Sequence, residues 1–147
     1  MQRKARIVAA ASALFEEYVE RECDAGRAAL TLGAGPRIIA LHSHCHQRAM
    51  GLVGPAKALL SRVPGAAVKD LDAGCCGMAG SFGYTREHYD VSRAIGELTL
   101  LPAARALPPD AVLAASGTSC RHQVAHFTGV KARHPAVLLQ SLLRGHT

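Results

Sequence analysis

The stretch Arg37-Ile38-Ile39-Ala40-Leu41 is a short apolar run in the first half of this 147-residue chain. The turn-forming residues Gly33-Ala34-Gly35-Pro36 precede it, and an apolar run bounded in this way predicts a buried strand. The run continues directly into His42-Ser43-His44-Cys45-His46. The chain is therefore expected to deliver three histidines and a cysteine to the carboxyl end of a strand.

Two more strands are predicted further along the chain, over residues 66–71 and 111–115. Helical segments separate the three strands, and a last helix over residues 134–143 follows them. Strands that alternate with helices in this way predict an α/β fold, with a short, mostly parallel β-sheet flanked by helices. We expect one domain over residues 1–147, which begins with an amphipathic helix over about residues 5–30.

The apolar faces of two helices follow the helical period. The first helix places Ile7, Ala11, Leu14 and Tyr18 on one face. A later helix, capped by Thr85, places Val91, Ile95 and Leu98 on one face, and Pro102 is expected to kink or end it.

The composition excludes several classes of protein. No apolar run approaches the roughly 20 residues that span a bilayer, so the chain is not transmembrane. Acidic residues follow the basic N-terminus too soon for a signal peptide, which favours a cytoplasmic location. The net charge of +6 comes from scattered residues, and aromatic residues make up only 4%, so no nucleic-acid partner is expected. An acidic protein surface suits this charge as well.

Each of the three predicted strands is followed by cysteine: Cys45 after the first, Cys75 and Cys76 after the second, and Cys120 after the third. Because ligands of parallel sheets collect beyond the carboxyl ends of the strands, these four thiols are expected to meet. An odd total of five cysteines, two of them adjacent, is a poor disulfide framework. Cys23 belongs to the first helix and is not expected to be a ligand.

Three kinds of chemistry remain open for this group. A Cys75–Cys76 disulfide is strained, because neighbouring Cα atoms lie about 3.8 Å apart and bridged pairs usually need about 4.4 to 6.8 Å. It also leaves Cys45 and Cys120 unexplained. A single zinc ion takes four Cys or His ligands but favours C-x-x-C spacing. Adjacent thiolates suit two irons of an iron–sulfur cluster, which four cysteines usually hold.

Several neighbours of the cysteines are candidates for contacting such a cofactor. Gly74 and Gly77 allow backbone conformations that let the loop approach a bulky group, and its N–H groups can then point at sulfur. Arg121 adds positive charge beside Cys120, at a predicted helix start. His44 and His46 flank Cys45 and either contact the cofactor or serve as ordinary polar and capping groups. His122 and His126, four residues apart, are expected to be mainly structural.

The motifs His44-Cys45-His46, Gly74-Cys75-Cys76-Gly77 and Cys120 resemble the CCG, or cysteine-rich, domain of the iron–sulfur subunits in glycolate and lactate oxidation systems and in heterodisulfide reductase. The resemblance is closer to the C-terminal part of fused FAD-linked oxidase and iron–sulfur proteins of the D-2-hydroxyglutarate and D-lactate dehydrogenase type. It covers about residues 37–143 and includes the strings Cys75-Cys76-Gly77-Met78-Ala79-Gly80-Ser81-Phe82-Gly83-Tyr84 and Gly117-Thr118-Ser119-Cys120-Arg121-His122-Gln123.

This resemblance implies a [4Fe–4S] cluster on Cys45, Cys75, Cys76 and Cys120, which passes electrons from the flavin of a FAD-linked 2-hydroxy acid dehydrogenase towards an acceptor. It implies as partners a FAD-binding domain or subunit and a ferredoxin-type domain, with FAD only in the partner. Partners of this kind can also hold a cytoplasmic protein at the inner face of the membrane. The chain by itself is expected to turn nothing over, either as an excised domain or as a separate subunit.

One residue departs from the general family pattern. Gly117 stands where that pattern has the first cysteine of a closing C-x-x-C, which argues against a five-cysteine cluster. The alternative to an iron–sulfur domain is a zinc-binding structural or docking module of the same type of complex.

Overall fold

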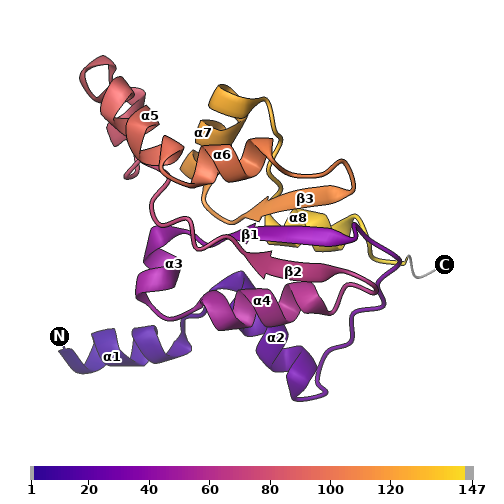
Figure 1. The fold of residues 1–147 in the computed structure, drawn as a ribbon. Helices are drawn as coiled ribbons and strands as arrows, with labels where there is room; N and C mark the ends of the chain where they lie inside the picture. Colours follow the sequence, from indigo (N-terminus) through magenta and orange to yellow (C-terminus); the bar gives the residue numbers. More distant parts are fainter. Residues whose placement is uncertain (1, 145–147) are drawn as a thin grey trace.

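The computed structural model describes residues 2–144, so the predicted domain 1–147 includes four residues outside this part. Its centre is a three-stranded sheet in the order β2-β1-β3 (Figure 1). β1 (Ile38–His42) pairs in parallel with β2 (Ala67–Asp70) on one side and β3 (Ala111–Ala115) on the other. This confirms the α/β class and the three predicted strands.

Helices connect the strands and surround the sheet (Figure 1). They are α1 (Gln2–Ala11), α2 (Phe15–Asp24), α3 (Cys45–Ala49), α4 (Val53–Ser61), α5 (Tyr89–Glu97), α6 (Leu100–Arg105), α7 (Thr118–Thr128) and α8 (Pro135–Gln140), with 3-10 turns η1 (Phe82–Tyr84) and η2 (Arg86–His88). The loop between β2 and η1 carries Cys75 and Cys76. Each strand therefore leads into a segment that bears cysteine.

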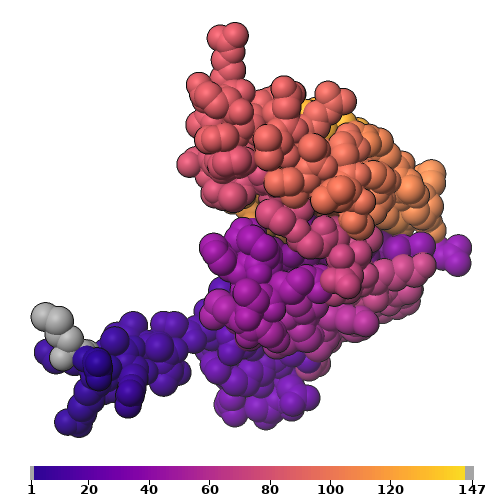
Figure 2. All heavy atoms as spheres, turned by 60° about the vertical axis from the view of Figure 1, so that its left-hand side comes forward, coloured from indigo at the N-terminus to yellow at the C-terminus, as the bar shows by residue number. Residues whose placement is uncertain are grey.

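The N-terminal segment forms two helices where one was expected. Leu14 adopts an extended backbone conformation between α1 and α2, so the helical period does not continue across the break. α1 buries none of its residues and projects from the body of the molecule (Figures 1 and 2). The predicted face of Ile7, Ala11, Leu14 and Tyr18 is consequently exposed, and α2 instead turns Glu16 inward.

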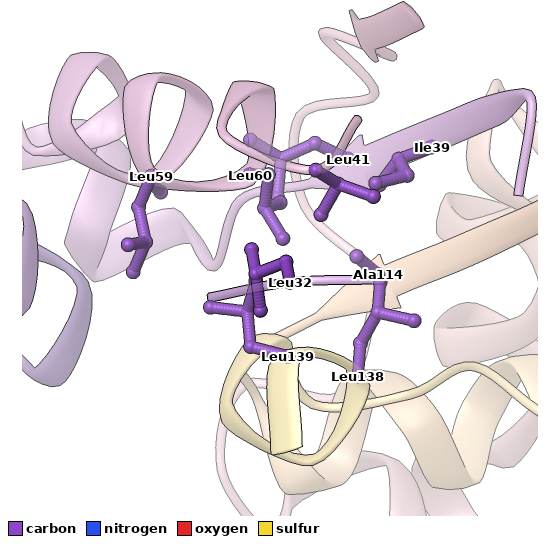
Figure 3. Close-up of a cluster of buried hydrophobic side chains, with 10 residues drawn as sticks. Leu32, Ile39, Leu41, Leu59, Leu60, Ala114, Leu138 and Leu139 are labelled. Atoms are coloured by element: carbon purple, nitrogen blue, oxygen red, sulfur yellow. The ribbon is translucent and has the colours of Figure 1, made fainter. Parts of the chain in front are cut away.

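Alternate residues of β1 serve two separate cores, as the period of a strand requires. Ile39 and Leu41 pack with Leu59 and Leu60 of α4 and with Leu138 of α8 (Figure 3). All five side chains are almost completely inaccessible to solvent. This cluster joins the sheet to the helices on one of its faces.

The second core lies on the other face and includes two of the cysteines. Ala40 of β1 packs there with Leu100 and Leu101 of α6, and the same cluster contains Cys76 and Cys120. Pro102 occupies the first turn of α6, where a missing N–H is tolerated. Because α5 already ends at Glu97, Pro102 neither kinks nor ends it, contrary to the prediction. The two cysteines thus form part of the packed interior.

α5 packs through small residues, contrary to the predicted apolar face. Ser92 and Gly96 are its buried positions, whereas Val91 and Leu98 are 51% and 79% exposed. A Cβ at Gly96 would lie 3.2 Å from the carbonyl oxygen of Cys76, so the helix approaches the cysteine loop too closely for large side chains.

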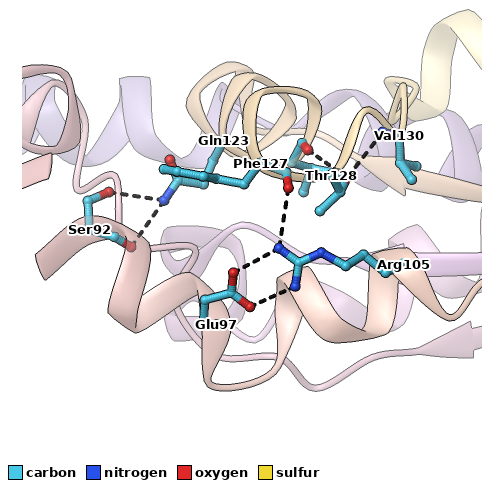
Figure 4. A network of polar contacts seen from close by, with 8 residues as sticks. Ser92, Glu97, Arg105, Gln123, Phe127, Thr128 and Val130 are labelled. Atoms are coloured by element: carbon cyan, nitrogen blue, oxygen red, sulfur yellow. Dashed lines mark hydrogen bonds and ion pairs between the residues drawn. The ribbon is translucent and has the colours of Figure 1, made fainter. Parts of the chain in front are cut away.

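Polar contacts hold α5, α6 and α7 together beside this loop (Figure 4). The amide nitrogen of Gln123 donates to the carbonyl oxygens of Cys76 and Ser92, at 3.2 and 3.0 Å. The guanidinium of Arg105 makes a two-pronged contact with Glu97, at 2.8 Å for both pairs. Gln123 is buried, so its bonds fix the position of the backbone that follows Cys75.

Among residues 2–144, no helix combines the length and the apolar character that crossing a bilayer requires.

We predict that Gly77→Ala strongly destabilises the fold. Gly77 has φ +92°, and a Cβ there would overlap the backbone carbonyl of Ser92 in α5. The free energy of unfolding should fall by about 3 kcal/mol or more, measured by urea denaturation.

Gly80→Ala is the matched control for this substitution. Gly80 also has positive φ, at +69°, but no atom lies within 4 Å of an added Cβ. It should cost only about 1 kcal/mol, from the backbone conformation alone. Equal losses for the two variants would contradict the packing of the loop against α5.

Candidate metal centre

Three cysteines line one cavity at the carboxyl end of the sheet. Cys45 begins α3 shortly after β1, and Cys75 and Cys76 lie in the loop after β2. The cavity has a volume of about 360 Å³. Its lining consists of these three cysteines with His44, His46, Ala79, Gly80 and Ser119.

The fourth cysteine lies directly behind this cavity. Cys120, in the first turn of α7, forms a compact buried group with Cys76 and His42. One sulfur or ring nitrogen from each of these three residues lies within 4.8 Å of the other two. Because Cys76 belongs both to this group and to the cavity lining, all four predicted cysteines come together at one end of the sheet.

His42 was not among the predicted site residues. It is the last residue of β1 and only 2% exposed, and its Nε2 has no hydrogen-bond partner. Its alternation with His44 and His46 at a strand end was the available sequence signal. A buried imidazole nitrogen that lies beside two thiols is a suitable donor to a metal ion.

Unpaired polar atoms concentrate in the segment that follows β1. Within residues 2–144, the buried side-chain atoms without a partner are His42 Nε2, Ser43 Oγ, Gln47 Oε1 and Arg48 Nε. Native proteins leave few such atoms unpaired, and bound water, ions or ligands commonly account for them. The segment from β1 into α3 is therefore built to meet something besides protein.

Ion pairs fasten the cysteine loop to α3. Arg48 contacts the carboxylates of Asp70 and Asp72, at 2.8 and 2.9 Å. Beyond this anchor, the backbone N–H of Gly77 donates to the sulfur of Cys75 at 3.3 Å. The expected backbone donation to sulfur therefore occurs in this loop.

The buried thiols differ in their affinity for protons. The pKa of Cys76 is lowered chiefly because Cys120 donates a hydrogen bond to it, and His42 and the N–H of Met78 also favour the thiolate, while burial opposes them. The pKa of Cys120 is raised by that same hydrogen bond and by burial. Burial and the neighbouring Cys75 likewise raise the pKa of Cys45. Of these buried thiols, Cys76 is therefore the one that loses its proton most readily.

This arrangement fits a thiolate-bound metal group. Removing the remaining protons without a cation would leave several negative charges close together in a poorly solvated space. A bound metal compensates those charges, so its binding and thiol deprotonation are coupled. The cysteines with His42 supply sulfur and nitrogen donors suitable for zinc or for iron–sulfur clusters.

The other predicted site residues have different positions. His44 lines the cavity and its Nδ1 accepts a hydrogen bond from the N–H of His46, as a helix cap. Gly74 has φ +63° with open space beside it. Arg121 does not line the cavity, because its guanidinium donates to the carbonyl oxygens of Ala115 and Ser116, at 2.9 and 2.7 Å.

Gly117 is confined by two site residues. A Cβ at this position would lie 2.6 Å from Cδ2 of His44 and 2.8 Å from the sulfur of Cys120. The space beside position 117 is therefore too small for a residue larger than glycine unless His44 and Cys120 move. The glycine that departs from the family pattern thus lies where the ring of His44 and the thiol of Cys120 both approach the backbone.

The remaining candidates lie apart from the cysteines. Tyr84 pairs with His122 at 2.6 Å and Tyr89 with His126 at 2.9 Å, which supports a structural role for both histidines. Cys23 is a free thiol in α2 and lines neither cysteine group.

Comparison with known proteins gives partial matches to dehydrogenases. The chain is 32% identical over 130 residues to one subunit of the anaerobic glycerol-3-phosphate dehydrogenase of Escherichia coli K12, covering 88% of this chain and 32% of that protein. It is 38% identical over 105 residues to D-2-hydroxyglutarate dehydrogenase of Pantoea ananatis, covering 70% of this chain and 10% of that protein. The chain resembles parts of two dehydrogenases.

A third match has the same character. D-2-hydroxyglutarate dehydrogenase of Pseudomonas putida is 43% identical over 68 residues, which cover 46% of this chain and 6% of that protein. The chain thus spans about a third or less of the length of these relatives. No family model and no solved structure matches it.

We predict that Cys120→Ala raises the pKa of Cys76 in the metal-free protein. The substitution removes the hydrogen bond that contributes most to the low pKa, so this pKa should move towards the ordinary value of about 8.5. Titration followed by the ultraviolet absorbance of thiolate measures the change. Cys23→Ala, remote from the pair, should leave the titration of Cys76 at low pH in place. If Cys120→Ala also left this titration unchanged, the hydrogen bond from Cys120 to Cys76 would be refuted.

Proposed function

We propose that the chain is an iron–sulfur electron-transfer domain of a FAD-linked dehydrogenase acting on a 2-hydroxy acid or a related hydroxy compound. The observation that carries this proposal is the meeting of four cysteines from three separate strand ends. The similarity to two dehydrogenases supports the assignment to oxidoreductases. The proposed ligands are Cys45, Cys75, Cys76 and Cys120.

A [4Fe–4S] cluster supplies one-electron transfer when it is bound. The residues of this chain hold the thiolates at fixed positions and limit access of water. Cys76 and Cys120 are part of the packed core, which favours a rigid site. The N–H groups of Gly77 and Met78 donate towards sulfur, an interaction that tunes the reduction potential of such groups.

The partners follow from the proposed reaction. Electrons are proposed to come from FAD in a separate domain or subunit and to pass through a ferredoxin-type domain. His44, His46, Gly74, Gly77 and Arg121 are proposed to surround the cluster or to shape its site. The chain alone is proposed to lack turnover, and a cytoplasmic location, free or at the inner face of the membrane through partners, suits this role.

Anaerobic reconstitution with iron and sulfide tests the proposal. The chain should bind about four irons and four sulfides and acquire the visible absorption of a [4Fe–4S] cluster. Cys76→Ser and Cys120→Ser should each lose most of this iron, because both sulfurs are fixed by the core. Cys23→Ser is the matched control and should retain it. A colourless product with freely alkylated Cys45 and Cys75 would overturn the proposal.

The compact group of His42, Cys76 and Cys120 favours a second candidate, a zinc-binding structural or docking module. Three donors within 4.8 Å of one another suit one tetrahedral ion, with Cys45 or Cys75 as the fourth ligand.

For this candidate, His42→Ala should weaken zinc binding by about 100-fold or more, measured by competition with a chelator. His122→Ala, which removes an imidazole that pairs with Tyr84 apart from the cysteines, is the control and should bind zinc normally. One equivalent of zinc without iron, even after anaerobic expression, would select this candidate. Unchanged zinc affinity in His42→Ala would remove it.

A further inference from the structure

A second cavity lies next to the cysteine-lined one. Its volume is about 320 Å³, and His44 and His46 line both cavities. The apolar part of its wall comes from Leu14, Phe15 and Met50. The polar part comes from Glu16, Gln47, Ser116 and His134 with the two shared histidines. Apolar surface beside converging polar groups is typical of small-molecule sites.

A buried carboxylate is the most unusual member of this wall. Glu16 is only 3% exposed, although it lies in the first turn of α2. Among its neighbours, Ser116 donates a hydrogen bond to its Oε1 at 2.6 Å. Acidic side chains are rarely buried unless something pairs with them, and Ser116 is that partner here. A carboxylate accepts several hydrogen bonds, so Glu16 can accept one more from a donor group within the cavity.

The imidazoles in the wall present hydrogen-bond donors. His134 Nδ1 accepts from the backbone N–H of Ala136 at 3.1 Å, which leaves the proton of the neutral ring on Nε2. Burial, with a smaller effect from Arg121, lowers the pKa of His134 and so favours the neutral ring, although Glu16 acts in the opposite direction. His44 also accepts through Nδ1, so its neutral ring likewise has Nε2–H.

One further polar group in the wall has no partner. Gln47 is 3% exposed, and its Oε1 makes no hydrogen bond within residues 2–144. This oxygen is itself inaccessible to solvent, so the acceptor that the cavity offers is Glu16, and the donors are His44 and His134. A hydroxyl group donates and accepts at once, so it satisfies both kinds of partner.

We propose that this cavity binds a small molecule that has a hydroxyl group on an apolar body and no negative charge. The apolar body would lie against Phe15 and Leu14, with the hydroxyl directed at Glu16. A carboxylate ligand is disfavoured because it would meet the charge of Glu16 in a poorly solvated space. The cavity is therefore not a site for a hydroxy acid. His44 and His46 border both cavities, so the bound molecule would lie beside the proposed cluster. Any effect of this molecule on electron transfer rests on the proposed function, whereas its binding to the cavity does not.

Phenol, benzoate and toluene are matched probes, because they share one ring and differ in the group that would face Glu16. Binding to the chain is followed by NMR, through the ring signals of Phe15 and His134. Phenol should shift these signals to saturation, at least about fivefold more tightly than toluene. Benzoate should bind more weakly than phenol.

Glu16→Gln should reverse the preference. It keeps the shape and an acceptor oxygen but removes the charge, so phenol should weaken by about fivefold while benzoate gains affinity. Glu17→Gln, one residue away and outside the cavity wall, should change neither. Ser116→Ala provides a second variant that frees the carboxylate without altering its charge, and it should retain the preference for phenol over benzoate.

Equal binding of phenol and toluene, or an unchanged ratio of phenol to benzoate in Glu16→Gln, would overturn the proposal. So would the absence of any shift at Phe15 and His134. These measurements need no iron, so they are independent of the reconstitution that tests the cysteine site. Failure of the iron–sulfur proposal would therefore leave the proposal for this cavity intact, and the reverse also holds.

Discussion

The parallel pairing of three strands is the constraint on which the rest of the structure depends. Parallel strands end at the same edge, so residues separated by about 75 positions in the sequence, such as Cys45 and Cys120, meet without any long loop to carry them there. The two cores on either face of β1 fix the strands, so the segments that bear the cysteines are already held in place before any cofactor binds. The geometry of the thiols is consequently a property of the whole domain.

Charge and burial act against each other at this edge. Cys76 and Cys120 lie in the hydrophobic core, where a free thiolate is unfavourable, yet a hydrogen bond between them favours one thiolate. The unpaired atoms after β1, from His42 to Arg48, belong to the same small region. A site with a buried thiolate and unpaired buried polar atoms is more readily explained by the binding of a metal or ligand than by packing alone. The neighbouring cavity around Glu16 extends this polar region to the far side of His44.

Much of this architecture was predictable, for identifiable reasons. The first and third strands were found because each is a short apolar run between turns, and the second because it alternates with the predicted helices. The convergence of the cysteines followed from their order along a parallel sheet. The helix faces were predicted less well: Ser92 and Gly96 pack because the cysteine loop leaves no space for large side chains, a property of two segments together. His42 was noticed as one of three alternating histidines but was not predicted as a site residue, since its neighbours Cys76 and Cys120 come from segments that follow other strands. The burial of Glu16 depends on Ser116, 100 residues away, which no local pattern reveals.

The close contacts at Gly117 limit which side chains can occupy this position, and so whether it can supply a further thiol. Residue 117 and the ring of His44 compete for the same space beside Cys120. A chain of this fold can therefore add a side chain at position 117 only if the imidazole at position 44 moves elsewhere. A fifth sulfur placed at position 117 would therefore require the ring of His44 or the thiol of Cys120 to leave its present orientation.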